Sequence, residues 1–192
     1  MTAMALVELS PAGAQRIRGL AWKGDTPRGN NGPSSEYFEV PFRLGVQVVN
    51  LQVGLRTADA DLALEAVQRI LGLTGKVGYL DPVASIYKVN IFDKMISNRG
   101  PFQPDAFQED AFRAEQEMDP YLNPAFFDLG RWTAAGRFAA IAQDSNFFTS
   151  REVRRFPSWL LRQKEEQIEP QVLTEVRAIR ETLRDSSLTE ED

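Results

Sequence analysis

Arginine and bulky aromatic residues are concentrated in residues 123–164 of a chain whose formal net charge is −5. Residues 131–164 hold seven Lys and Arg against two Asp and Glu, whereas residues 101–130 hold one against seven. Guanidinium groups bind carboxylates bidentately and aromatic rings supply buried area, so this combination is typical of protein interfaces. We therefore predict a partner-binding surface that consists of Arg131, Trp132, Arg137, Arg151, Arg154, Arg155 and Trp159.

An intramolecular role for the same arginines is an open alternative. Acidic segments lie on both sides of the basic one, since residues 165–192 hold nine Asp and Glu against three Lys and Arg. Segments adjacent in sequence usually become neighbours in space, so these charge blocks can pair with each other. The aromatic residues would then lie in the core, and each surface ion pair would contribute about 0–1 kcal/mol.

The absence of both cysteine and histidine limits the chemistry of the chain. It excludes disulfides, thiolate nucleophiles, iron–sulfur ligation by cysteine, the usual zinc sites, and Ser-His-Asp or Cys-His catalysis. We therefore expect no catalytic residue and no cofactor, and predict a non-catalytic protein-interaction or structural subunit of a larger assembly. The alternative from a different class is an enzyme that uses carboxylates, Tyr or Lys with a bound cofactor.

Nucleic acid and metal ions are the other ligands that the sequence brings into question. Arginines neutralise phosphates and aromatic rings stack on bases, but a nucleic-acid-binding domain is usually basic overall, which disfavours this partner. Asp59 with Asp61, or Glu115 with Glu117 and Asp119, could bind a hard cation. The first pair falls in the first turn of a predicted helix, and two residues of the second set would not share a helical face. We predict no metal site.

The sequence also bears on location and association. No apolar run approaches the roughly 20 residues that a membrane-spanning helix needs, and the first residues lack the basic and apolar regions of a signal peptide. We predict no membrane span, a cytoplasmic location, and either a protein partner or self-association.

The expected fold class is α+β and mostly helical. A small strand-containing half, residues 1–100, is expected to precede a helical half, residues 101–192, that ends in an acidic tail. The division falls at the break formed by residues 98–101, which are Asn, Arg, Gly and Pro. Turn-forming residues predict a mobile loop over 23–36, after a short helix over 11–22.

Residues 37–56 carry the main strand prediction. Their β-branched residues and period-two alternation favour extended structure, which Pro41 would divide into two pieces. The alternation slips once, and a helical face is the alternative, but the valines and glycines favour a strand. A second short strand is expected over 77–80. The alternative helical face would consist of Leu44, Val48, Leu51 and Leu55.

Apolar spacing and capping residues predict the remaining elements as helices. Thr57 is expected to cap the first of these, and Thr149 with Glu152 to form a capping box before another. Small residues at 130, 134, 135 and 136 would let a neighbouring helix approach closely. The predicted helices cover residues 60–71, 82–97, 104–118, 124–143, 150–166 and a last helix from 170.

Overall fold

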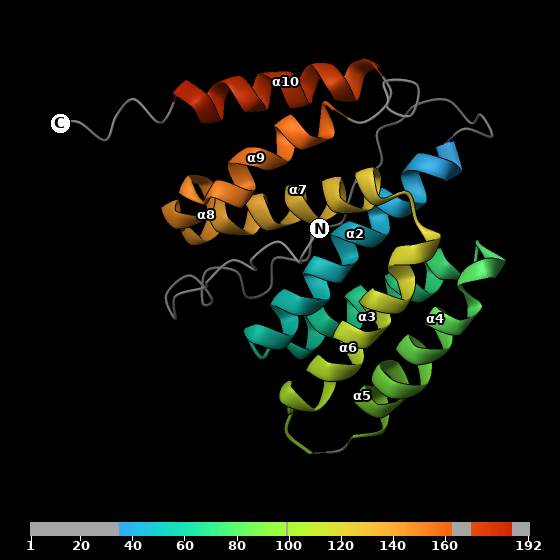
Figure 1. Cartoon of the computed structure of the whole chain (residues 1–192). Coiled ribbons are helices and arrows are strands. Elements are labelled where there is room, and N and C mark those ends of the chain that lie inside the picture. Colours follow the sequence, from blue (N-terminus) through green and yellow to red (C-terminus); the bar gives the residue numbers. More distant parts are fainter. Residues whose placement is uncertain (1–34, 99, 163–169, 186–192) are drawn as a thin grey trace.

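The computed structural model describes residues 35–98, 100–162 and 170–185, and these residues form helices joined by short connections (Figure 1). Two 3-10 turns, η1 (Gly78–Leu80) and η3 (Asp119–Tyr121), and one π-helical segment, η2 (Tyr87–Phe92), supplement the α-helices. The α-helices are α2 (Ser35–Arg56), α3 (Ala60–Thr74), α4 (Asp81–Ile86), α5 (Asp93–Ser97), α6 (Asp105–Met118), α7 (Pro124–Ala142), α8 (Ser145–Thr149), α9 (Arg151–Leu160) and α10 (Pro170–Asp185).

The predicted α+β class is wrong, because the described residues contain no strand. Residues 37–56, predicted as strand, lie within the 22-residue helix α2, and Pro41 lies inside that helix. The short strand expected over 77–80 is replaced by the 3-10 turn η1. The helical alternative for residues 37–56 is therefore the correct one.

Burial of α2 on two faces explains why it resembles a strand in the sequence. Val46, Val49 and Val53 recur at i, i+3 and i+7 and enter one hydrophobic cluster. The residues at the same helical spacing on a second face enter another cluster, and these are Val40, Leu44, Val48, Leu51 and Leu55. The two stripes interleave, so the combined pattern alternates and then slips, although each stripe alone has the helical period.

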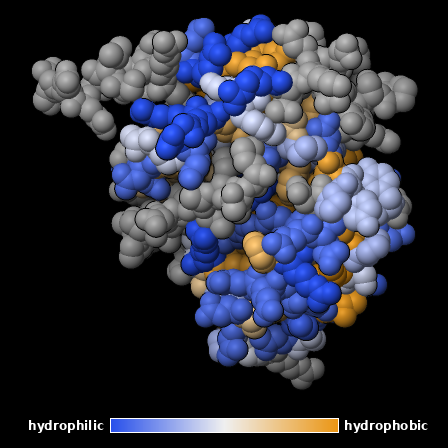
Figure 2. Space-filling model, viewed as in Figure 1, coloured by the Kyte–Doolittle hydropathy of each residue, from blue (hydrophilic) through white to orange (hydrophobic). Residues whose placement is uncertain are grey.

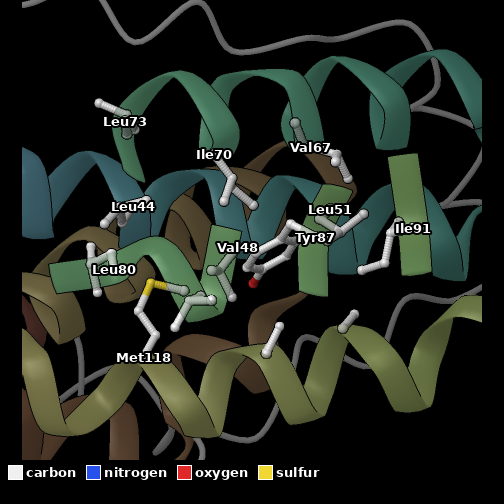
Figure 3. Close-up of a cluster of buried hydrophobic side chains, with 14 of the residues drawn as sticks. Leu44, Val48, Leu51, Val67, Ile70, Leu73, Leu80, Tyr87, Ile91 and Met118 are labelled. Carbon is white, nitrogen blue, oxygen red and sulfur yellow. The ribbon is translucent and has the colours of Figure 1, made fainter. Parts of the chain in front are cut away.

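The described helices pack in two clusters, and α2 contributes to both, as do α3 through Leu62 and α7 through Phe127. The upper cluster packs α2 against α7, with Phe147 of α8, Val153 of α9 and Leu173 of α10 (Figure 1). The lower cluster packs α2 against α3, α4, η2 and α6, with Tyr87 at its centre (Figure 3). Helix α2 is therefore the element on which both halves of the core depend.

Glycines allow α2 and α7 to touch backbone to backbone. A Cβ atom on Gly45 of α2 would collide with the carbonyl oxygen of Phe127 on α7. A Cβ atom on Gly130 of α7 would collide with the carbonyl oxygen of Phe42 on α2. The prediction of a close approach at residue 130 is confirmed. On α2, the absence of a side chain at Gly45 allows the same close approach.

Helices are present at each position predicted after residue 57, with three differences. The helix predicted over 82–97 contains the π-helical segment η2, the helix predicted over 150–166 ends at Leu160, and the short helix α8 was not predicted. Asp59 caps α3, because its Oδ1 accepts a hydrogen bond from the backbone nitrogen of Leu62 at 3.0 Å. The expected cap, Thr57, instead donates its hydroxyl to the carbonyl oxygen of Val53 at 2.9 Å. At α9 the cap is Ser150, one residue after the expected Thr149.

Several expectations fall on residues that the structure does not describe. These are the helix over 11–22, most of the loop over 23–36, the end of the helix predicted over 150–166, and the last residues of the acidic tail. Residues 35 and 36 of the expected loop are described, and they begin α2.

Candidate functional site

The seven residues predicted to bind a partner lie on two helices with different surroundings. Arg131, Trp132 and Arg137 belong to α7, which is buried along most of its length. The other four belong to α9, a short amphipathic helix at the surface. The predicted residues therefore form two structural groups, one on the mostly buried α7 and one on α9 at the surface. Each group has to be assessed separately as a partner-binding site.

Arg131 is buried and paired inside the protein. Its side chain is 8% exposed, and its Nη2 atom lies 2.9 Å from Oε1 of Glu115 on α6, whose side chain is 10% exposed. Its Nη1 atom lies 3.6 Å from Oδ1 of Asp128 one turn earlier on α7. The guanidinium group also lies over the ring of Phe127, 5.8 Å from its centroid. This is the intramolecular pairing with the acidic segment that the sequence left open.

A buried polar centre surrounds this ion pair. Gln52 of α2 donates its Nε2–H to Oε2 of Glu115 at 2.7 Å, so α2, α6 and α7 meet at one carboxylate. Tyr87 is fully buried, and burial, followed by the negative charge of Glu115, raises the pKa of its hydroxyl. Three atoms of this centre are buried without a hydrogen bond in the described structure, namely the Tyr87 hydroxyl oxygen, Gln52 Oε1 and Arg131 Nε.

Tyr87 stands at the start of η2, the π-helical segment, and its ring lies between α2 and α6 among Val48, Leu51 and Met118 (Figure 3). π-Helical turns occur often at functional sites. The sequence analysis missed this tyrosine, although its spacing of four residues from the buried Val83 and Ile91 marks it as inward-facing.

Polar contacts fix η2 and α5 against α6. Asn90 donates its Nδ2–H to Oδ1 of Asp110 at 3.0 Å. The other oxygen of Asp110 lies 3.3 Å from the ammonium nitrogen of Lys94, so one carboxylate of α6 holds two residues of the neighbouring helical segment. These contacts are partly exposed, and they join α6 to η2 and α5 outside the buried ion pair.

Trp132 connects α7 to α9. It is 8% exposed, donates its indole N–H to the carbonyl oxygen of Val153 at 3.3 Å, and stacks on Phe156 with ring centroids 5.6 Å apart. Arg137 is half-buried further along α7, and burial lowers the pKa of its guanidinium group. Trp132 is therefore the residue of this group that holds α9 against α7.

Helix α9 has a sharply divided surface. Val153, Phe156, Pro157 and Leu160 are buried on one side. On the opposite side Arg151 and Arg155 are exposed at i and i+4, and the exposed Arg162, just beyond the helix end, continues the same line at i+11. We call Arg151, Arg155 and Arg162 the arginine stripe.

No member of the arginine stripe forms an ion pair with a described residue, since none has a carboxylate oxygen within 4.0 Å among them. Figure 2 shows strongly hydrophilic residues over α9 and α10 in the upper part of the molecule. The stripe therefore presents positive charge to solvent, unlike Arg131.

The other two predicted residues of α9 lie beside the stripe. Arg154 is half-buried and donates its Nε–H to the carbonyl oxygen of Phe148 at 3.1 Å. Trp159 is half-buried and packs on Phe156 with ring centroids 5.5 Å apart. Both residues therefore make intramolecular contacts that help to hold α9 in place.

The carboxylates considered as cation ligands have other partners. Asp59 caps α3, and Glu115 binds Arg131 and Gln52, whereas Glu117 is exposed. Within the described residues, no group of three or more Asp and Glu side chains is arranged to hold a metal ion.

The described residues form an almost entirely helical fold with two hydrophobic clusters to which α2 contributes, and with a basic face on α9. No helix in the described ranges has both the length and the apolar character needed to cross a membrane. A scan against protein-family models and searches of curated proteins and of solved structures found no match.

Proposed function

We propose that this chain is a non-catalytic protein-interaction subunit that docks through the arginine stripe onto an acidic protein surface. The observation that carries the proposal is a line of exposed guanidinium groups on α9 that no described carboxylate neutralises. Planar guanidinium groups bind carboxylates in a bidentate geometry, and complementary charge at an interface accelerates and orients association.

The packing of α9 supports this role, because the stripe is presented on a rigid helix. Ser150 caps its first turn through a hydrogen bond from the backbone nitrogen of Val153 at 3.3 Å. Phe156 and Leu160 anchor the opposite side in the upper cluster, and Trp132 adds a hydrogen bond from α7. A preorganised helix loses less conformational entropy on binding than a loose one.

The predicted residues then divide by role. Arg151 and Arg155 are expected to contact the partner, with Arg154 and Trp159 at the edge of the contact. Arg131, Trp132 and Arg137 are expected to act indirectly, with Trp132 holding α9 against α7 and Arg131 holding α7 against α6.

The first prediction is that the double variant Arg151→Glu/Arg155→Glu loses a complex that the unaltered protein forms in the source cell. The native mass of complexes recovered with each form measures this. Reversal of both charges should weaken binding by about tenfold or more, since each close charge pair at an interface is worth about 1 kcal/mol or more. Both residues are exposed, so helical content measured by circular dichroism should not change.

The matched control is Lys76→Glu/Lys88→Glu, which makes the same change in net charge at two exposed residues outside α9. This control should keep the complex. If the α9 variant keeps the complex, the proposal is overturned. It is also overturned if the protein binds an oligonucleotide in preference to a protein partner and this binding requires the arginine stripe.

A further inference from the structure

Helix α6 carries a surface that complements the arginine stripe. Asp105 and Glu109 are exposed at i and i+4, and Phe112, which is 53% exposed, follows at i+7. We call these three residues the acidic face of α6. Neither carboxylate forms an ion pair within the described residues, although Asp105 accepts a hydrogen bond from Nε2 of Gln108 at 3.1 Å.

The two carboxylates of the acidic face match the first two guanidinium groups of the arginine stripe in spacing. The carboxylates at 105 and 109 and the guanidinium groups at 151 and 155 are each one helical turn apart. Helix α6 has 14 residues and α9 has 10, so at about 1.5 Å per residue α9 fits within the length of α6. Phe112 adds exposed apolar area, and the half-buried Trp159 lies beside the stripe.

We propose that the partner of the arginine stripe is a second copy of this chain, with α9 of one copy against α6 of the other. This inference rests on the proposed function and names its partner. A single contact between two short helices buries less than the roughly 1,000 Å² expected of a stable interface. A two-fold axis forms the same contact twice and therefore doubles the buried surface area.

The arrangement of the two helices suits a reciprocal contact. Helices α6 and α9 are seen from one side of the molecule in Figure 1, at different heights on either side of α7. Hydrophilic residues are visible in both the upper and the lower part of that side (Figure 2). In the proposed dimer, the α6 of the second copy lies against α9 while its α9 meets α6.

The second prediction is a charge exchange between two variants, measured by sedimentation or by light scattering after size-exclusion chromatography. The unaltered chain should form a dimer that weakens as salt rises. Arg151→Glu/Arg155→Glu and Asp105→Lys/Glu109→Lys should each dissociate about tenfold or more readily, because like charges then face each other at both contacts. An equimolar mixture of the two variants should recover the dimer, since both contacts again join unlike charges.

Asp105 lies in the first turn of α6, where an acidic residue favours the helix. If the double variant of α6 does not fold, Glu109→Lys alone leaves that turn intact and carries the same test. Unaltered protein that stays monomeric over the whole concentration series would overturn the inference, as would a dimer that neither reversal weakens or a mixture that fails to recover.

The two proposals fail in different ways. A monomeric purified protein whose cellular complex still requires Arg151 and Arg155 would overturn self-association and support docking to another protein. A chain with no complex that depends on these arginines would overturn both.

Discussion

At the scale of single residues, the contrast between Arg131 and Arg155 shows what decides the role of an arginine in this chain. Both lie in the same basic segment, yet one is buried against Glu115 and the other is exposed without an ion pair to any described residue. A buried ion pair is costly to break, because removal of one member leaves an uncompensated charge out of water. An exposed pair is worth about 0–1 kcal/mol.

The third prediction is that Glu115→Leu lowers the free energy of unfolding by about 3–5 kcal/mol, because Arg131 stays buried without its nearest carboxylate. The double variant Glu115→Leu/Arg131→Leu should lose less than the two single variants together, since neither charge is then left alone. Urea unfolding of all four forms measures the coupling between the two residues.

The matched control for that cycle is the partly exposed pair of Glu39 and Arg43, whose charged atoms lie 2.6 Å apart on α2. Glu39→Leu should change stability by no more than about 1 kcal/mol. Additive effects of the Glu115 and Arg131 substitutions would contradict a coupled buried pair.

The fourth prediction concerns pH and Tyr87. Burial raises the pKa of its hydroxyl in the folded chain. Above the ordinary tyrosine pKa of about 10, the unfolded chain loses this proton while the folded chain retains it, so stability falls as pH rises. Tyr87→Phe should remove the part of this pH-dependent loss of stability that comes from the Tyr87 hydroxyl. Urea unfolding from about pH 8 to about pH 11 should therefore show a shallower decline for the variant.

Near neutral pH, Tyr87→Phe should cost little, because the hydroxyl that it removes has no hydrogen bond in the described structure. Tyr79→Phe, at an exposed tyrosine, is the control and should keep the pH dependence of the unaltered protein. A large loss of stability from Tyr87→Phe at neutral pH would show that the hydroxyl is hydrogen-bonded in solution.

At the scale of elements, the contact between α2 and α7 depends on two glycines. Gly45 and Gly130 face the backbone of the opposite helix, and an added methyl group would meet a carbonyl oxygen at either position. Backbone atoms cannot turn aside as a flexible side chain can. The two helices would have to separate, which would loosen both hydrophobic clusters on α2.

The fifth prediction is that Gly45→Ala and Gly130→Ala each lower the free energy of unfolding by at least about 1–3 kcal/mol, through overpacking. The matched control is Gly72→Ala in α3, where an added Cβ meets no atom within 4 Å. That control should stabilise the protein by up to about 1 kcal/mol, because alanine favours helix more than glycine does. Denaturant unfolding compares the three variants, and equal effects at all three positions would contradict the close contact.

At the scale of the whole molecule, α2 belongs to both clusters, while the break predicted at residues 98–101 lies in the connection between α5 and α6. Helix α6 follows this break and packs with α3, α4 and η2, which precede it. The division into residues 1–100 and 101–192 stays a prediction about the independence of these parts. Residues from both sides of the break contribute to the lower cluster.

Much of the helical structure could be predicted from the sequence, because local signals fix where helices begin and which face is apolar. Asn123 before Pro124 predicts the start of α7, and the Asn123 side chain does accept a hydrogen bond from the backbone nitrogen of Ala125 at 3.0 Å. The error over residues 37–56 arose because a helix buried on two sides loses the one-sided apolar stripe that identifies most helices.

The sequence by itself determined the absence of cysteine and histidine chemistry, the segregation of charge and most helix boundaries, since these depend on composition and on near neighbours. Only the tertiary structure decided that α2 is a shared helix, that Arg131 meets Glu115, and that Arg151 and Arg155 face outward. Burial and ion pairing depend on contacts between residues far apart in the chain. Such contacts follow from how the helices pack against each other, which local patterns do not specify.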